Sequence, residues 1–482
     1  MALFKCPECG ELISTESISC PKCGYNVNAY MENNGDKIQC NHCWKLNESG
    51  TKFCSHCGNN LQYSHSVKDG LPSDDLKQAK IDEHERKTLP IILAIIIGVV
   101  VGIVDTVFGR GLIAISDFRT ANYKYLIPFL PVAGLLITWL YLRFSKLSLK
   151  GMTLVFEVGQ EKRDSIPLAL VPLVMVGTWI THLFGGSAGR EGVAVQIGAT
   201  LSHYLGRKMK TPDNSKVMLI TGMAAGFGGL FQTPLAATFF AMEVIVAGYM
   251  DYQALLPAII GAFVASFTSH SLGLEKFAVE LKSTVDLSNM KIVAIVIILG
   301  LAFGIVGRLF SKLLQILKKF MVEKFVNHYV RIGVISIPLA IILISLWQGR
   351  YSGLGTNLIS SVFSGGEVYG IDWILKLLLT VLTLSIGFQG GEVTPLFSIG
   401  ATLGMVLGGL LGISPVLCGA LGYAAVFGSA TNTLIAPIML GIEVFGGSNM
   451  LLFVVVCSIA YIVNGNKSIY GAQEKSSNLQ IK

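Results

Sequence analysis

A glycine-rich segment that carries two charged residues lies between strongly apolar regions of the chain. It spans residues 185–196 and reads GGSAGREGVAVQ, with Arg190 and Glu191 among its glycines. Charge at membrane depth is costly, so such residues usually face an aqueous path through the protein. Free backbone N–H groups at a helix start attract anions. The segment therefore predicts an anion pathway with a protonatable gate.

A second segment of the same kind follows about two hundred residues later. Residues 390–398 read GGEVTPLFS and place Glu392 after two glycines. Both segments run into the same five residues, IGATL, at 197–201 and 399–403. Repeated apolar segments that are interrupted by glycine or proline indicate a transporter site between two halves.

The correspondence between the two halves continues further along the chain. AAGFG at residues 224–228 matches AAVFG at 424–428, and Glu243 then matches Glu443 without a gap. Glycine-rich membrane helices also resemble one another simply because small residues pack closely. The shared order and spacing of two separate blocks favour an internal repeat. We expect Glu243 and Glu443 to be buried carboxylates that cap or bond neighbouring helices.

The composition independently predicts a membrane protein. The chain is 52% hydrophobic and only 14% charged, with a mean hydropathy of +0.60, whereas soluble domains are about 25% charged. Apolar runs occupy residues 89–108, 125–144, 166–183, 255–267, 292–310, 332–347 and 374–388. Several are shorter than the roughly 20 helical residues that cross a bilayer. We therefore expect an all-α polytopic membrane protein with tilted and re-entrant helices.

The net charge of +7 bears on membrane topology. Lysine and arginine cluster in the segments that connect apolar runs, at residues 146–150, 207–210 and 312–319. Such clusters favour the cytoplasmic side of the membrane. Because the positive residues are scattered between the spans, we expect no nucleic-acid partner.

Eight of the ten cysteines lie in the first sixty residues, as four CxxC pairs. Ten residues separate the two pairs of each set, and the second set repeats the first after 34 residues. Four thiolates on two tight turns suit a tetrahedral structural zinc ion. The sequence thus predicts two zinc ions, one held by Cys6, Cys9, Cys20 and Cys23 and one by Cys40, Cys43, Cys54 and Cys57.

Other uses of these cysteines are less consistent with the pattern. Disulfides are rare in cytosolic proteins, and an iron site with four thiolates stays an alternative to zinc. Reduced thiols imply that the N-terminal units lie in the cytosol. We predict zinc-ribbon units at residues 1–28 and 29–63, a polar linker or solvated helix at 64–87, a transport domain at 88–473 and a tail at 474–482.

The membrane region resembles the CLC family of chloride channels and anion/proton antiporters. GREG at residues 189–192 matches the gating-glutamate loop of the family, GEVTP at 391–395 occupies its second anion loop, and KSIY at 467–470 resembles the segment whose tyrosine points into the anion path. The resemblance implies the CLC fold of inverted repeats, one pore per subunit, a homodimer, and a multi-pass protein of the cell membrane.

Three departures from the usual family pattern resemble the fluoride-exporting branch, CLC-F. Met152 replaces the chloride-coordinating serine, and Glu392 with Thr394 replaces the usual aromatic of the second loop. Val244 stands where proton-coupled chloride members have a second glutamate. Glu392 is therefore the candidate for the missing proton carrier, beside the gate Glu191.

Fluoride is small and strongly hydrated, so a pore must replace its water by close hydrogen-bond donors. Hydroxyl and backbone N–H groups near the two glutamates supply such donors. The predicted anion-binding residues are Met152, Gly189, Gly192, Val193, Val393, Thr394 and Tyr470.

Three functions stay open at the level of sequence. The first is fluoride/proton antiport that exports cytosolic fluoride. The second is a chloride channel or chloride/proton exchanger of the same fold. In the third, the zinc ribbons bind a partner and the CLC domain anchors them. We expect no enzymatic activity, because no nucleophile–base arrangement is evident.

Overall fold

The computed structural model divides into two compact units, residues Met1–Leu89 and Pro90–Lys482. It describes residues 3–9, 11–14, 17–34, 36–40, 45–61, 66–67, 73–208, 214–281, 283, 285 and 288–475. Cys43, residues 68–72 of the predicted linker and residues 476–482 of the predicted tail lie outside this set. The finer domain boundaries predicted above stay predictions.

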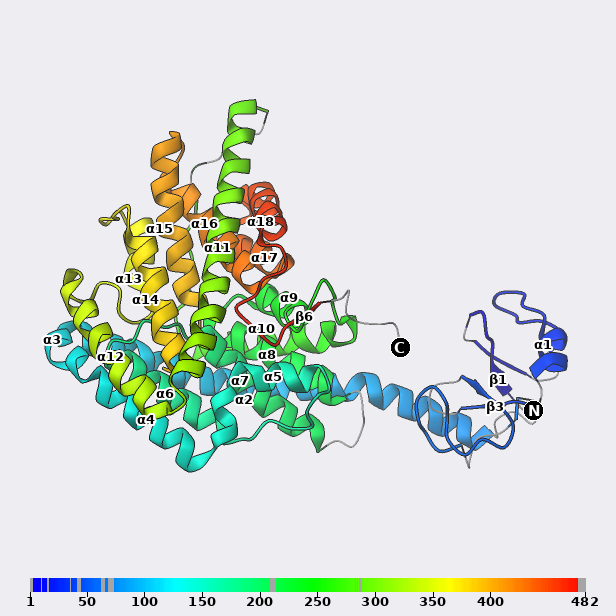
Figure 1. The fold of residues 1–482 in the computed structure, drawn as a ribbon. Helices are drawn as coiled ribbons and strands as arrows, with labels where there is room; N and C mark the ends of the chain where they lie inside the picture. Colours follow the sequence, from blue (N-terminus) through cyan, green and yellow to red (C-terminus); the bar gives the residue numbers. More distant parts are fainter. Residues whose placement is uncertain are drawn as a thin grey trace. The chain divides into compact units, whose positions relative to one another are not determined.

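The first unit contains two small antiparallel sheets. β1 (Leu3–Lys5) pairs with β2 (Leu12–Ser14), and β3 (Ile38–Gln39) pairs with β4 (Leu46–Asn47). One short helix, α1 (Val27–Asn34), follows the first sheet (Figure 1). The hydrophobic core of this unit is small and includes Cys6 and Cys20.

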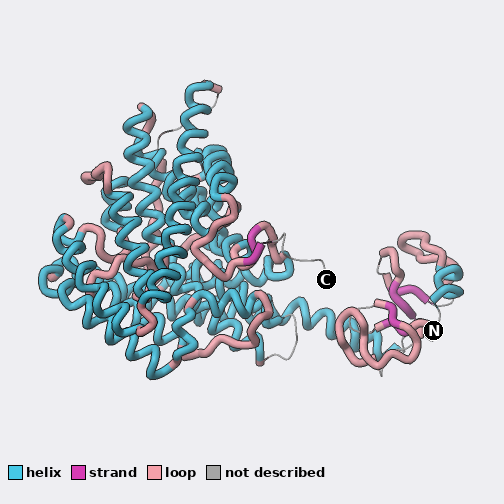
Figure 2. The backbone as a smooth tube through the Cα atoms, in the orientation of Figure 1, coloured by secondary structure: helices cyan, strands magenta, loops and turns pink. Residues whose placement is uncertain are grey.

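The second unit is helical, and its described strands are short (Figure 2). Its helices are α2 (Ser73–Ala121), of which residues 90–121 belong to this unit, α3 (Tyr123–Leu126), α4 (Leu130–Phe144), α5 (Met152–Gly159), α6 (Leu170–Leu183), α7 (Glu191–Arg207), α8 (Asn214–Phe231), α9 (Pro234–Glu243), α10 (Leu255–Ser271), α11 (Met290–Lys324), α12 (His328–Ser345), α13 (Thr356–Phe363), α14 (Asp372–Ile386), α15 (Val393–Leu411), α16 (Pro415–Thr431), α17 (Ile435–Phe445) and α18 (Met450–Asn464). Strands β5 (Val246–Ala247) and β6 (Glu474–Lys475) pair in parallel.

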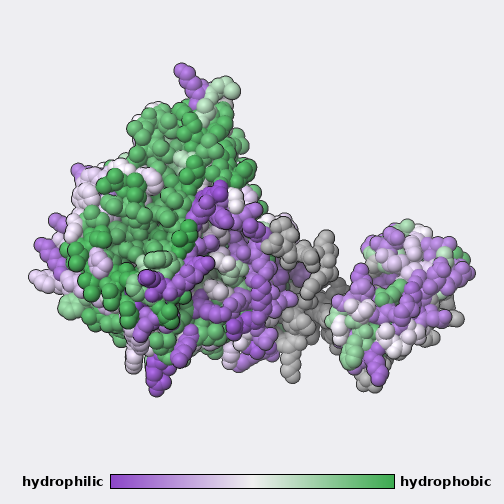
Figure 3. All heavy atoms as spheres, in the orientation of Figure 1, coloured by the Kyte–Doolittle hydropathy of each residue, from purple (hydrophilic) through white to green (hydrophobic). Residues whose placement is uncertain are grey.

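Among the described residues, seven helices are long and apolar enough to cross a membrane. They include five of the predicted apolar runs, and they add residues 393–411 and 447–464. Residues 170–183 of the run at 166–183 form α6, and residues 374–386 of the run at 374–388 lie in α14; both helices are too short to count as spans. Hydrophobic side chains cover a broad face of this unit around α11 and α12, whereas hydrophilic ones gather near β6 (Figure 3).

The internal repeat appears in the packing of two helix pairs. In the first half α7 packs on α8, and in the second half α15 packs on α16. Each pair crosses where two glycines meet, because a Cβ atom on Gly198 would overlap the carbonyl of Gly222, and one on Gly400 would overlap that of Gly422. Small residues at these crossings let the backbones approach closely. The repeat thus places α7 and α15 in equivalent positions.

Candidate functional site

The two glycine-rich loops of the repeat meet directly in front of α7 and α15. Gly189 and Gly391 exchange two backbone hydrogen bonds, with N···O distances of 2.5 and 2.8 Å. A Cβ atom at Gly189 would lie 3.0 Å from the Gly391 carbonyl oxygen and 2.8 Å from Pro395. Only glycine permits this close approach, which brings the N-termini of the two helices together.

Glu191 is the first residue of α7, and its side chain reaches the opposite half of the repeat. The carboxylate accepts hydrogen bonds from the Thr394 hydroxyl at 2.7 Å and from the Thr394 backbone N–H at 3.0 Å. It also accepts one from the backbone N–H of Arg190 at 3.2 Å. Only 1% of Glu191 is exposed. The predicted gate residue is therefore enclosed between the loops in this conformation.

Arg190 contributes little to this contact. Its Nε lies 3.7 Å from a Glu191 carboxylate oxygen, and its buried Nε and Nη1 have no hydrogen-bond partner among the described residues. These two nitrogens therefore donate no hydrogen bond that would fix the loop in the described part of the chain.

Glu392 immediately precedes α15 and faces a cavity rather than the sealed contact. The cavity has a volume of about 290 Å³. Predicted site residues in its wall are Met152, Gly192, Glu392 and Tyr470, and the sequence reasoning did not single out Phe156 and Gln196, which also line it. Glu392 is half-buried. The two carboxylates thus differ in their surroundings. Glu191 is enclosed by protein, whereas Glu392 lines a cavity whose wall also contains basic side chains.

Tyr470 and Met152 lie on the wall of this cavity. The Tyr470 ring packs against Phe156, with ring centroids 5.1 Å apart, and against Phe240 at 6.4 Å. Its buried hydroxyl has no hydrogen-bond partner among the described residues. Met152 begins α5 directly after Gly151, whose φ of +52° suits glycine. Tyr470 therefore offers a free donor in the cavity, and Met152 offers an apolar surface.

Several of the predicted backbone donors already have partners within the protein. The amides of Gly189 and Val193 donate to the carbonyls of Gly391 and Arg190. The Thr394 amide donates to the Glu191 carboxylate. In this conformation the carboxylate occupies donors that would otherwise suit an anion. A carboxylate and an anion can therefore compete for one position here.

Glu243 and Glu443 form a second relationship between the halves, at the ends of α9 and α17. The Glu443 carboxylate accepts from the backbone N–H of Leu235 at 3.0 Å and of Ala236 at 2.8 Å, at the start of α9. The Glu243 carboxylate accepts from Ala436 at 2.9 Å and from two neighbouring amides, at the start of α17. Each glutamate therefore caps the helix that carries the other, as expected.

Lys376 is a site residue that the sequence reasoning missed. This lysine of α14 is fully buried. Its ammonium donates to the Ser187 hydroxyl at 2.9 Å and to the carbonyls of Gly353 and Tyr351 at 2.7 and 3.2 Å. It thereby fixes the loop that leads to Glu191. The partners are distant in sequence, so no local spacing could have indicated them.

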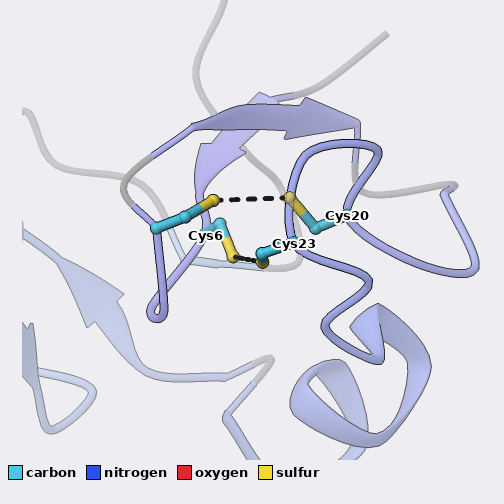
Figure 4. Close-up of side chains that lie close together, drawn as sticks. Cys6, Cys20 and Cys23 are labelled. Carbon is cyan, nitrogen blue, oxygen red and sulfur yellow. Dashed lines mark hydrogen bonds between the residues drawn. The ribbon is translucent and has the colours of Figure 1, made fainter.

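The first cysteine set forms a compact cluster in the N-terminal unit. The Sγ atoms of Cys6, Cys9, Cys20 and Cys23 all lie within 4.8 Å of one another. Figure 4 shows Cys6, Cys20 and Cys23 turned toward a common centre. Removal from water raises the pKa of the Cys20 thiol, but backbone hydrogen bonds from Cys23 and Lys22 outweigh this and lower it to about 7. A thiolate near neutral pH is what a metal ligand must supply.

The second set forms a similar cluster as far as it is described. The Sγ atoms of Cys40, Cys54 and Cys57 lie within 4.8 Å of one another. The fourth predicted ligand, Cys43, lies outside the described residues. The first group of thiols fits a metal ion that takes four sulfur ligands in a tetrahedron, and the second offers three such ligands among the described residues.

Taken together, the interrupted helices, the two facing loops and the buried carboxylate define a membrane protein that moves anions. The chain belongs to the voltage-gated chloride channel family, whose model matches residues 133–465. A zinc-ribbon model matches residues 2–27. The family consists of channels and transporters, which confirms that the protein is a multi-pass membrane transport protein and not an enzyme.

Three known proteins are similar over most of the chain. A chloride/fluoride channel protein from Pseudomonas syringae pv. tomato is 33% identical over 394 residues, which cover 79% of this chain and 85% of that protein. A CLC-type fluoride/proton antiporter of known crystal structure is 50% identical in sequence to this chain. The two structures superpose with a TM-score of 0.79, over 84% of this chain and 100% of the other. A cyanobacterial Cl⁻/H⁺ antiporter shares the fold, with a TM-score of 0.69 at 20% identity.

Proposed function

We propose that the protein exports cytosolic fluoride in exchange for protons. The observation that carries this proposal is the contact of the Glu191 carboxylate with both the hydroxyl and the amide of Thr394. A small, strongly hydrated anion needs two such close donors in place of water. The 50% identity to the fluoride/proton antiporter supports the same substrates.

In the proposed cycle, Glu191 and fluoride take turns on the donors of Thr394. When Glu191 takes up a proton, the neutral side chain leaves these donors and fluoride replaces it. Glu392 carries the proton on the other side, where its side chain faces the cavity. The absence of a glutamate at Val244 supports this role, because a coupled transporter needs a second protonatable group.

The anion path is proposed to include the remaining site residues. Tyr470 donates its hydroxyl from the cavity wall, and Met152 leaves one side of the path apolar. Backbone groups of Gly189, Gly192, Val193 and Val393 contribute as the loops rearrange. We further propose that the protein works as a homodimer in the cell membrane, with the zinc units in the cytosol.

For the N-terminal unit we propose two structural zinc ions. Four sulfur ligands close the coordination sphere of zinc and leave no open position for chemistry. Zinc would link turns that are otherwise held by a very small core. The cluster around Cys6 and Cys20 supports the first ion, and the three described thiols around Cys54 support the second.

A second candidate function is a gated channel that passes fluoride or chloride. The observation in its favour is the name of the Pseudomonas relative, a chloride/fluoride channel protein. In a channel, opening of Glu191 would admit the anion without any proton crossing. Proton movement therefore distinguishes the two functions.

The test is anion efflux from proteoliposomes that contain wild-type protein and are loaded with fluoride or with chloride. A proton-sensitive dye records proton movement in the same vesicles. We expect fluoride to leave much faster than chloride and protons to enter as it leaves. Equal rates for both anions would overturn the fluoride assignment, and fluoride efflux without proton uptake would favour the channel.

A further inference from the structure

The cavity that Glu392 faces is lined by several basic side chains. These residues, which we call the basic mouth, are Lys150, Lys318, His328 and Arg331. Lys150 and Lys318 are exposed, so the cavity wall that they form reaches solvent. Among the lining residues, the one acidic side chain is Glu392. A concave site in which basic side chains outnumber acidic ones attracts anions.

The basic residues of the mouth differ in how far their charge is neutralised. Lys150 pairs with Glu157 at 2.6 Å, a carboxylate that also pairs with Arg163 at 2.8 Å. Lys318 has no salt bridge to an acidic side chain in the described part of the chain. Its charge therefore faces the cavity and the solvent.

Arg331 is the buried member of the mouth. Only 8% of it is exposed, and it lies in the first turn of α12. Its Nε donates to the Ile386 carbonyl at 3.2 Å, and its Nη2 donates to His328 Nδ1 at 2.9 Å. Its Nη1 is buried and has no hydrogen-bond partner in the described residues. No carboxylate among these residues pairs with the guanidinium.

A buried guanidinium without a counter-ion is costly. Its contact with Ile386, at the end of α14, is one compensation, because a cation stabilises a helix C-terminus. That contact uses Nε alone. The charge and the free Nη1 still lack a partner, although Arg331 lies beside a cavity that a small anion can enter.

We propose that Arg331 and Lys318 form an additional anion-binding position, at the basic mouth, which a small inorganic anion occupies before it reaches Glu392 and Tyr470. Arg331 supplies the fixed charge and a free donor, and His328 holds its guanidinium in place. Lys318 draws anions in from solvent. The inference rests on the proposed transport function, and it names the position at which the anion first binds in the transport path.

The experiment measures the initial rate of fluoride efflux against fluoride concentration in proteoliposomes. Arg331→Gln is expected to raise the half-saturating concentration about tenfold, with a smaller change in the maximal rate. Arg331→Lys keeps the charge and should lie closer to wild type. Lys318→Gln should raise the same concentration about twofold, and an impermeant salt should shrink that difference by screening.

Lys319→Gln is the matched control for Lys318→Gln. Lys319 is the next residue of α11, is highly exposed, pairs with Glu323 at 3.7 Å and does not line the cavity. It should leave the half-saturating concentration unchanged. A folded Arg331→Gln protein with the wild-type value would overturn the proposal. If Arg331→Gln fails to fold, a Lys318→Gln protein that behaves like Lys319→Gln overturns it instead.

These outcomes are independent of which anion the protein prefers. If the wild type moves chloride rather than fluoride, the fluoride proposal fails, and the same variants are measured with chloride. A rise in the half-saturating chloride concentration for Arg331→Gln would then still support the basic mouth as an anion-binding position.

Discussion

The Glu191 side chain of one half of the repeat is held by Thr394 of the other half. The Thr394 hydroxyl and backbone N–H lie 2.7 and 3.0 Å from the two carboxylate oxygens. The hydrogen bonds between Gly189 and Gly391 bring these residues together. One carboxylate therefore closes the junction of the two loops, and its release would expose the donors of Thr394.

Thr394→Val should slow fluoride efflux roughly tenfold. Valine keeps the branched shape but removes the hydroxyl, and a hydrogen bond to a charged group contributes about 1.5–3 kcal/mol. Without the hydroxyl, Thr394 no longer donates this hydrogen bond to the Glu191 carboxylate or to fluoride at the proposed site. The initial rate of efflux from proteoliposomes measures the effect.

Thr402→Val is the matched control for this change. Thr402 lies on the same helix, is buried, and donates its hydroxyl to the Ser398 carbonyl at 2.7 Å within that helix. We expect near wild-type efflux from this variant. Equal rates for Thr394→Val and Thr402→Val would show that the Thr394 hydroxyl has no role in transport.

Met152→Ser should relax the preference for fluoride over chloride. Met152 presents an apolar side chain to the cavity, whereas serine would add a hydroxyl that can bind chloride. The measurement is the ratio of fluoride to chloride efflux under identical loading. An unchanged ratio would mean that Met152 only fills space.

The sequence predicted the helical membrane fold, the repeat and the residues at the loop junction. Charged side chains are rare in membrane-spanning segments because they are costly there, so Glu191 and Glu392 stood out as candidates for an anion path. Glu191 indeed meets Thr394, and Glu392, Met152 and Tyr470 share one cavity. Their assignment as gate, carrier and anion ligands stays a prediction, because contact alone does not establish a role in transport.

Other parts of the site were not predictable from local patterns. Arg331 and Lys376 resemble ordinary charged residues at helix ends or in short apolar runs. Their importance comes from partners such as Ile386 and Ser187, which only the tertiary fold brings near. The run at residues 374–388 likewise resembled a span, but α14 is a short helix that buries Asp372 and Lys376.

Purified protein should contain about two zinc ions per chain, one for each four-cysteine set. Cys9→Ser should remove about one of them, because it takes one thiolate from the first cluster. Elemental analysis of the wild type and the variant gives the count. Wild-type protein without bound metal, with all eight thiols freely reactive, would contradict the prediction.

Glu443→Gln should destabilise the protein by about 1–2 kcal/mol, because the amide accepts fewer hydrogen bonds at the start of α9 and has no charge to favour the helix N-terminus. Glu243→Gln should have a similar effect at α17. Thermal unfolding in detergent measures both. Glu323→Gln, at an exposed site on α11, is the control, and equal midpoints for all three variants would contradict a capping role.

The central claim is that Glu191 and Glu392 together exchange protons for fluoride, and proton uptake driven by an outward fluoride gradient tests it most directly. Wild-type vesicles should take up protons as fluoride leaves. Glu191→Gln and Glu392→Gln should each abolish this uptake, since an amide of the same shape cannot carry a proton. A correctly folded Glu392→Gln protein that takes up protons at the wild-type rate would contradict the account.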